Sequence, residues 1–140
     1  MWNPDEYAVL LNDALGRNET IVFTGTCSIR YSGRAESQLG DGDRLVLIKS
    51  DKTLLVHQPQ GNTPINYMKS ETSHKFSVAD GKLLLKSQHL SEKEYLEAVF
   101  HRIHFFNSHK LEDVQVITVA GTEEDMSNML MERPELIEDG

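Results

Sequence analysis

The side chains best suited to hold a metal ion are three histidines in the later part of the chain, His101, His104 and His109. On a helix His101 and His104 would share one face, whereas on a strand residues three apart point to opposite faces. No carboxylate stands at a convincing ligand spacing beside them. A metal hydrolase built on these histidines is one of three functional hypotheses, but we predict no metal ligand and no catalytic residue.

Other groups with reactive side chains are readily explained as structure. Cys27 is the only cysteine, so one chain can form neither a disulfide nor a cysteine-based zinc site. Its apolar neighbours indicate a buried thiol. The run Gly40-Asp41-Gly42-Asp43 lacks the remaining ligands of a calcium loop and the context of a phosphate-binding loop, so it predicts a tight loop. No Ser–His–Asp or Cys–His arrangement can be assigned.

Charge is distributed unevenly along the chain. The net charge of −8 argues against nucleic acid, because that affinity comes mainly from Lys and Arg that neutralise phosphates. However, seven bases face five acids from Arg30 to Lys75, whereas nine acids face one base from Glu112 to Gly140. The middle of the chain is therefore weakly basic. Ordinary solvated faces are the alternative interpretation.

Length and hydropathy bound the organisation of the chain. The 140 residues, 39% of them hydrophobic, suffice for one modest core. No apolar run reaches the roughly 18 residues that cross a bilayer, and the first residues lack the basic start and apolar stretch of a signal peptide. We expect a cytoplasmic protein that does not contact membranes.

The patterns predict one helix followed by many short strands. Asn3 can cap a helix that begins at Pro4 and ends near Gly16. In the next stretch Phe23, Cys27 and Ile29 share a face with Tyr31. Strands are predicted over 21–34, 44–49, 53–57, 65–68, 75–78, 82–86 and 113–119, and a further helix after Thr122 carries Met126, Met129 and Leu130. The fold class is mainly β, a partly open β-barrel or sandwich with an N-terminal helix and a C-terminal linker helix.

One segment gives conflicting signals. Residues 91–94, Ser-Glu-Lys-Glu, resemble a capping box, and Leu96, Val99 and Ile103 fit a helical stripe. The run from Val99 to Phe106 is nevertheless rich in β-forming residues. Periodicity and composition leave both a helix and a strand open here.

Several spaced motifs occur together in one order. They are Gly33-Arg34-Ala35, Leu39-Gly40-x-Gly42-x-Arg44-Leu45, Leu55-Val56-His57, Pro64-Ile65-Asn66-Tyr67, Gly121-Thr122-Glu123-Glu124-Asp125-Met126 and Pro134-Glu135-Leu136-Ile137-Glu138-Asp139-Gly140. Through them, the sequence resembles the archaeal and actinobacterial NucS/EndoMS endonucleases. The resemblance covers nearly the whole chain.

The resemblance implies that the chain consists of two parts with different roles. Residues 1–120 would form a DNA-binding and dimerisation domain, a partly open β-barrel with 95–106 mostly in strands, and 121–140 a linker to a RecB-like nuclease domain beyond Gly140. The parent would be a metal-dependent endonuclease that repairs mismatched, branched or single-stranded DNA. Mg²⁺ or Mn²⁺ and a sliding-clamp contact would belong to the parts beyond this chain, which would itself bind no cofactor and cut nothing.

The resemblance also suggests DNA-binding residues. Arg34 matches an arginine that contacts DNA, and Tyr67 stands where the family has a Trp that stacks on an unpaired base. Asn66 lies beside it, Arg44 and Lys69 are neighbouring candidates for phosphates, and Asn62 replaces a basic residue common in the family. Because tyrosine is smaller and one charge is missing, we expect weaker binding than in Trp-bearing relatives.

Two alternatives remain at this level. Tyr67 could be an ordinary aromatic of an edge strand. The domain could also be a purely structural dimerisation module without its own DNA specificity, dimerising through a sheet edge formed by the predicted strand around Val114 to Val119.

Overall fold

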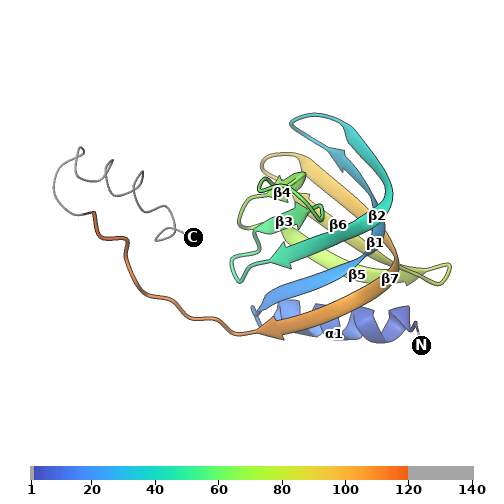
Figure 1. Cartoon of the computed structure of the whole chain (residues 1–140), viewed down its shortest axis with the longest axis horizontal. Coiled ribbons are helices and arrows are strands. Elements are labelled where there is room, and N and C mark those ends of the chain that lie inside the picture. The colour runs from blue at the N-terminus through green and yellow to red at the C-terminus, as the bar shows by residue number, and fades with distance from the viewer. Residues whose placement is uncertain (1, 120–140) are drawn as a thin grey trace.

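The computed structural model describes residues 2–119, which form one helix and one antiparallel sheet. The elements are α1 (Pro4–Gly16), β1 (Thr20–Ser32), β2 (Ser37–Ile48), β3 (Leu54–His57), β4 (Asn66–Met68), β5 (Ser73–Ala79), β6 (Lys82–His89) and β7 (Glu94–His109). The strand order is β4-β3-β2-β1-β7-β6-β5. The sheet curls into a half-barrel, and α1 lies along its lower end in the view of Figure 1. The predicted mainly β fold with an N-terminal helix is confirmed.

The helix begins and packs as its sequence predicts. The Asn3 side chain accepts a hydrogen bond from the backbone N–H of Glu6, and Pro4 occupies the first turn. Ala8, Leu11, Ala14 and Leu15 are buried. On the same helix, the Asn12 amide donates to the backbone oxygen of Phe76 and accepts from its N–H, at 2.9 and 3.0 Å. The helix thereby occupies hydrogen-bonding groups on the edge strand β5, which would otherwise be open to another strand.

The long central strand β1 supplies much of the core. Its burial alternates as predicted, and Phe23 packs against Phe76 and Phe100 with ring centroids 5.8 and 5.3 Å apart. Cys27 is fully buried, and this burial raises the pKa of its thiol to about 11. The interpretation of Cys27 as a structural thiol agrees with this position, because a thiolate is strongly disfavoured there.

The predicted tight loop at residues 40–43 is wrong. These residues lie within β2, where Gly42 is opposite Cys27 and Asp43 opposite Thr26, and the chain instead turns after Ser32. Alternating glycine and aspartate are typical of turns. Here the register with the long strand β1 overrides that local preference.

The ambiguous segment is a strand. Residues 94–109 form β7, as the family resemblance implies, and pair with both β1 and β6. The proposed capping box is instead the turn between β6 and β7, in which Lys93 has φ +57° and donates its N–H to the oxygen of Leu90. Strand pairing on both sides therefore decides between the two competing patterns.

The predicted strand at 113–119 is wrong. Residues 110–119 have no regular secondary structure, and Val114, Val116 and Ile117 are 82–90% exposed. Their β-forming composition finds no pairing strand among residues 2–119. The predicted linker helix lies outside the described residues. Within the described part, no helix is long and apolar enough to cross a membrane.

Candidate functional site

Arg34, just after β1, joins two strands that are not neighbours in the sheet. Its Nη1 donates to Glu94 Oε2 at the start of β7 (2.8 Å), and its Nη2 donates to the backbone oxygen of Tyr67 in β4 (3.0 Å). Nearby, Lys69 Nζ lies 3.5 Å from Glu92 Oε2 in the β6–β7 turn. We call these five residues, Arg34, Tyr67, Lys69, Glu92 and Glu94, the seam, because they connect β4 to the start of β7 across the curled sheet.

The Arg34 guanidinium lies against two tyrosine rings. Its central carbon is 4.2 Å from the ring centroid of Tyr67 and 4.9 Å from that of Tyr31. The Tyr31 hydroxyl accepts a hydrogen bond from the backbone N–H of Arg34 at 3.1 Å. Stacking on aromatic faces suits the flat, delocalised guanidinium. These contacts hold a cation and a half-exposed aromatic ring in one arrangement.

Gly33 is required for the close approach of these groups. A Cβ at this position would lie 2.8 Å from the Tyr31 hydroxyl and 2.9 Å from Cγ of Glu94. Contacts this short between heavy atoms force neighbouring groups to move. The glycine of the Gly33-Arg34-Ala35 motif therefore lets the turn carry Arg34 onto both Tyr31 and Glu94.

The partner carboxylate is buried, whereas the arginine is not. The side chain of Glu94 is 3% exposed and that of Arg34 is 40% exposed. Glu94 Oε1 has no hydrogen-bond partner within the described residues. A buried carboxylate is stable only near a positive charge, which Arg34 supplies. Arginine has five N–H donors, so Arg34 keeps donors beyond the two engaged with Glu94 and Tyr67.

The other residues predicted to bind DNA near Tyr67 lie in β4 or directly after it. Tyr67 is 48% exposed between the buried Asn66 and Met68, as expected for alternate residues of a strand. Asn66 Oδ1 is buried without a hydrogen-bond partner in the described part of the chain. The structure therefore brings Arg34 and Tyr67 into contact, with Asn66 and Lys69 adjacent along the chain.

Arg44 has a different environment. It is 8% exposed, and its Nη1 donates to the backbone oxygens of Cys27 and Gly40. Between Cys27 and Ile29 the register of β1 and β2 shifts. A shift of this kind leaves ladder groups without their usual partners. Arg44 is buried and stabilises this irregularity through these two hydrogen bonds. It is not part of the seam.

The sequence did not identify two neighbours of Arg34, which are Tyr31 and Glu94. The alternation in β1 placed Tyr31 on the core side but gave no reason to link its hydroxyl to the backbone of Arg34. Glu94 appeared only as the end of a proposed capping box. A buried acid next to a predicted arginine cannot be recognised before the strands that carry them are paired.

The histidines form two separate pairs with aspartates. His101 Nε2 lies 3.0 Å from Asp41 Oδ1, and His104 Nε2 lies 3.0 Å from Asp43 Oδ1. Between Tyr95 and His109, His101 and His104 are the two β7 residues without a β1 partner, because the register shifts twice. These bulges let both histidines reach aspartates of β2, although residues three apart in a regular strand point to opposite faces.

The aspartates are also held by hydrogen bonds. The Thr26 hydroxyl donates to Asp43 Oδ1 at 2.6 Å, and this bond, with a smaller effect of His104, lowers the pKa of Asp43. Within residues 2–119, no three His, Cys, Asp or Glu side chains are grouped as metal ligands. The geometry of the described region therefore gives no support to the metal-hydrolase hypothesis.

A curled antiparallel sheet with an arginine stacked on a half-exposed tyrosine at its seam defines the class as a mainly β domain. The family model described as "Endonuclease NucS N-terminal PH-like domain" matches residues 17–116. The chain belongs to this family of NucS N-terminal domains.

Curated relatives and solved structures agree with this assignment. Endonuclease NucS of Methanocaldococcus jannaschii is 34% identical over 86% of this chain and 46% of its own length, and that of Thermococcus kodakarensis is 28% identical over 97% and 54%. A structure titled "Structure of EndoMS-dsDNA2 complex" superposes with a TM-score of 0.80 at 28% identity, covering 100% of this chain and 59% of that one. The chain spans about half the length of these relatives.

Proposed function

We propose that this chain is the DNA-binding domain of a NucS-type endonuclease and that the seam contacts the DNA. The observation that carries the proposal is the position of the Arg34 guanidinium. It lies on the half-exposed ring of Tyr67 and donates a hydrogen bond to Glu94. The similar structure titled as an EndoMS complex with double-stranded DNA supports DNA as the ligand.

The two residues would act on different parts of the DNA. The free donors of Arg34 would bind a phosphate, since a guanidinium forms charge-assisted hydrogen bonds with phosphate oxygens. Tyr67 would stack on a base, an interaction that contributes about 1–3 kcal/mol per base. Because the Arg34 guanidinium also lies against the Tyr67 ring, base stacking and phosphate binding would depend on each other.

This arrangement favours bases that are already free to leave the duplex. Stacking on Tyr67 requires a base whose face is accessible, and extruding a mismatched base costs less than extruding a paired one. We therefore propose mismatched or single-stranded DNA as the substrate, in the context of DNA repair. Lys69, which directly follows β4, would add a further phosphate contact. Asn66 and Arg44 are buried, so they would act mainly by stabilising β4 and β2.

The complete protein would carry further parts. The relatives are endonucleases about twice as long as this chain, and we propose that a nuclease domain using Mg²⁺ or Mn²⁺ follows, with a sliding-clamp contact beyond it. We also propose that the parent is a cytoplasmic homodimer. This chain would bind and dimerise without cutting DNA.

A structural dimerisation module is the second candidate. The exposed apolar side chains of Val114, Val116 and Ile117 favour it, because such a concentration is typical of a protein–protein contact. Under this alternative the chain would form a stable dimer that has no measurable affinity for DNA at low salt.

Fluorescence anisotropy with labelled single-stranded, mismatched and matched oligonucleotides tests the proposal. The wild-type chain is expected to bind the first two more tightly than the third, and Arg34→Ala and Tyr67→Ala are each expected to weaken that binding. Wild-type affinity in both variants would contradict the assignment. Sedimentation of the same samples would show whether the dimer persists without binding DNA.

A further inference from the structure

We propose a second DNA-contacting site on the outer face of the sheet, formed by Arg30, Lys75 and Lys86, which would hold the sugar–phosphate backbone next to the base stacked by Tyr67. The proposal rests on the proposed function, since it takes DNA as the ligand, but it concerns residues outside the seam. We call these three residues the basic row.

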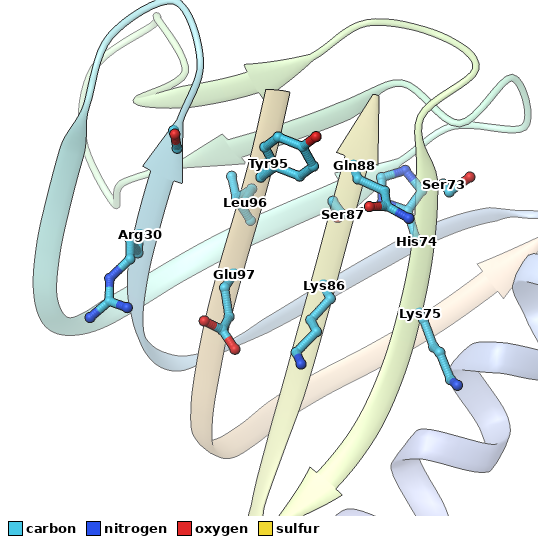
Figure 2. A pocket seen from close by; sticks show the side chains of 11 residues that line it. Arg30, Ser73, His74, Lys75, Lys86, Ser87, Gln88, Tyr95, Leu96 and Glu97 are labelled. Atoms are coloured by element: carbon cyan, nitrogen blue, oxygen red, sulfur yellow. Dashed lines mark hydrogen bonds between the residues drawn. The ribbon is translucent and has the colours of Figure 1, made fainter. Parts of the chain in front are cut away.

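Strand pairing places the basic row in one line. Arg30 of β1 is opposite Glu97 of β7, Glu97 is opposite Lys86 of β6, and Lys86 is opposite Lys75 of β5. All three bases line one cleft of about 590 Å³, and Figure 2 shows them along the same side of the strands. Four neighbouring strands span about 14 Å. A row of this length can face more than one phosphate, since each strand of B-DNA carries one charge per about 3.4 Å of helix axis.

The charge of the basic row is available for a ligand. Arg30, Lys75 and Lys86 are exposed, and within residues 2–119 none of them has a carboxylate within 4.0 Å. The cleft is lined by three basic residues and one acidic residue, Glu97, although the net charge of the chain is −8. Local excess charge of this kind attracts an anionic polymer and raises its association rate. By contrast, Arg34 and Lys69 of the seam already have acidic partners.

A second line of residues connects the basic row to the seam. Ser32 is opposite Tyr95, Tyr95 opposite Gln88, and Gln88 opposite Ser73, and all four line the same cleft. This line lies two residues, or about 7 Å, nearer the seam than the basic row. Tyr95 directly follows Glu94, the partner of Arg34, at the start of β7, and its side chain points to the opposite face of the sheet. A DNA strand that leaves Arg34 around this end of the sheet would therefore cross this line before it reaches Arg30 and Lys86.

The second line offers groups suited to the bases. Tyr95 is 46% exposed and presents an aromatic ring between the amide of Gln88 and the hydroxyl of Ser32. Basic grooves lined with aromatic rings are the usual surface for single-stranded nucleic acid, because every base has a face that can stack. The cleft thus combines backbone neutralisation by the basic row with a second stacking position at Tyr95.

The salt dependence of DNA binding tests the basic row. For the Lys75→Gln/Lys86→Gln variant, the slope of log affinity against log salt on a single-stranded oligonucleotide should fall by about 1.4, since each phosphate contributes about 0.7. Adding Arg30→Gln should lower it by about 2.1 in total. The matched control is Lys49→Gln/Lys110→Gln, which removes the same charge from two exposed lysines outside the cleft and should leave the slope nearly unchanged.

Tyr95→Ala provides an independent measurement. It should lower the affinity about tenfold while the salt slope stays at the wild-type value, because stacking is lost but no phosphate contact is. Circular dichroism of each variant verifies that it is folded. The basic row and Tyr95 therefore predict two different changes in one experiment.

The outcomes separate this inference from the proposed function. If Arg34→Ala and Tyr67→Ala weaken binding but the basic-row variants keep the wild-type slope, the outer-face site is wrong and the proposed function stands. If the wild-type chain binds no oligonucleotide, both are wrong. If the basic-row variants change only the oligomeric state in sedimentation, this face is a protein interface, which overturns the outer-face site.

Discussion

The seam and the bulged part of the sheet, where the register of β1 shifts against β2 and β7, each contain an arginine, but the two regions use it differently. In the seam, Arg34 is 40% exposed, contacts one buried carboxylate and lies on a tyrosine ring. In the bulged part, Arg44 is 8% exposed and donates only to backbone oxygens. An arginine whose donors are consumed by the backbone supports the fold, whereas one with free donors beside an exposed ring is available to a ligand. Changes at Arg44 should therefore reduce stability alone, whereas changes at Arg34 should also reduce binding.

Gly25 gives the largest expected effect, and it lies in the bulged part. A Cβ there would clash with the backbone oxygen of Arg102 and lie 3.0 Å from the ring of Phe100. Gly25→Ala should lower the free energy of unfolding by about 3 kcal/mol, because the tightly paired β1 and β7 must move apart. Urea denaturation measures the change.

Gly40 supplies the matched control for Gly25. It also lies in a strand, but no atom comes within 4 Å of an added Cβ. Gly40→Ala should therefore change stability by less than about 1 kcal/mol. Equal losses in the two variants would show that the close approach at Gly25 does not constrain the fold.

Substituting the two arginines tests the comparison directly. Arg44→Met should cost about 2–3 kcal/mol of stability, because hydrogen bonds from a charged donor to the oxygens of Cys27 and Gly40 are lost. The folded variant should keep the wild-type salt dependence for DNA. Arg34→Met should instead lower the DNA affinity of the folded protein about tenfold, and it should also destabilise the fold, because the buried Glu94 carboxylate loses its cation.

Denaturation and anisotropy on the same two preparations check this division. An equal loss of affinity in folded Arg44→Met and Arg34→Met would contradict the claim that only Arg34 binds DNA. Full affinity in both variants would contradict it as well.

Tyr67 tests the stacking half of the seam. Tyr67→Ala should weaken binding to mismatched and single-stranded DNA by about 1–3 kcal/mol, because the stacking surface is lost. Tyr67→Trp should strengthen it, because the larger ring covers more of a base. Equal affinity of wild type, Tyr67→Ala and Tyr67→Trp would mean that Tyr67 is an ordinary edge-strand aromatic.

His74 gives the smallest expected effect and concerns a contact that involves neither arginine. It joins β5 to the β2–β3 turn, with Nε2 2.8 Å from the backbone oxygen of Lys52 and Nδ1 2.7 Å from Ser87 Oγ. Burial lowers the pKa of His74 below its usual 6.5. Below pH 6.5 the unfolded chain therefore binds more protons than the folded one, so stability should be complete above that pH and fall as the pH drops through the folded-state pKa.

His74→Gln tests this pH dependence. The variant should show a flatter decline of the urea midpoint between pH 7 and pH 5 than wild type, because glutamine does not titrate. His57→Gln is the control at a histidine for which neither side-chain hydrogen bonds nor ion pairs are found within residues 2–119. Parallel pH profiles for wild type and His74→Gln would contradict the assigned role.

The fold was largely predictable because local patterns and pairing agree. Phe23, Cys27, Ile29 and Tyr31 alternate in a strand that is buried on one face, so their inward orientation follows from a period of two. The strands predicted over 75–78 and 82–86 are likewise present, within β5 and β6. Residues 113–119 carry the same β-forming composition, but a strand also needs a partner, which composition cannot reveal.

The candidate site was only partly predictable. The family resemblance pointed to Arg34 and Tyr67, which the structure places in contact across the seam. Nothing in the sequence indicated that Glu94 is the buried partner of Arg34, since the two meet only after the sheet curls. Nor could it show that Arg44 is enclosed, because charged residues are expected on the surface unless paired.

The most direct test of the account is a double-mutant cycle on DNA affinity with Arg34→Met, Tyr67→Ala and the combined variant. Because the guanidinium lies 4.2 Å from the ring centroid, each single variant should weaken binding to a mismatched duplex. The combined loss should differ from the sum of the single losses by more than about 0.5 kcal/mol. Strictly additive losses, or no loss in any variant, would contradict the claim that Arg34 and Tyr67 bind DNA as one unit.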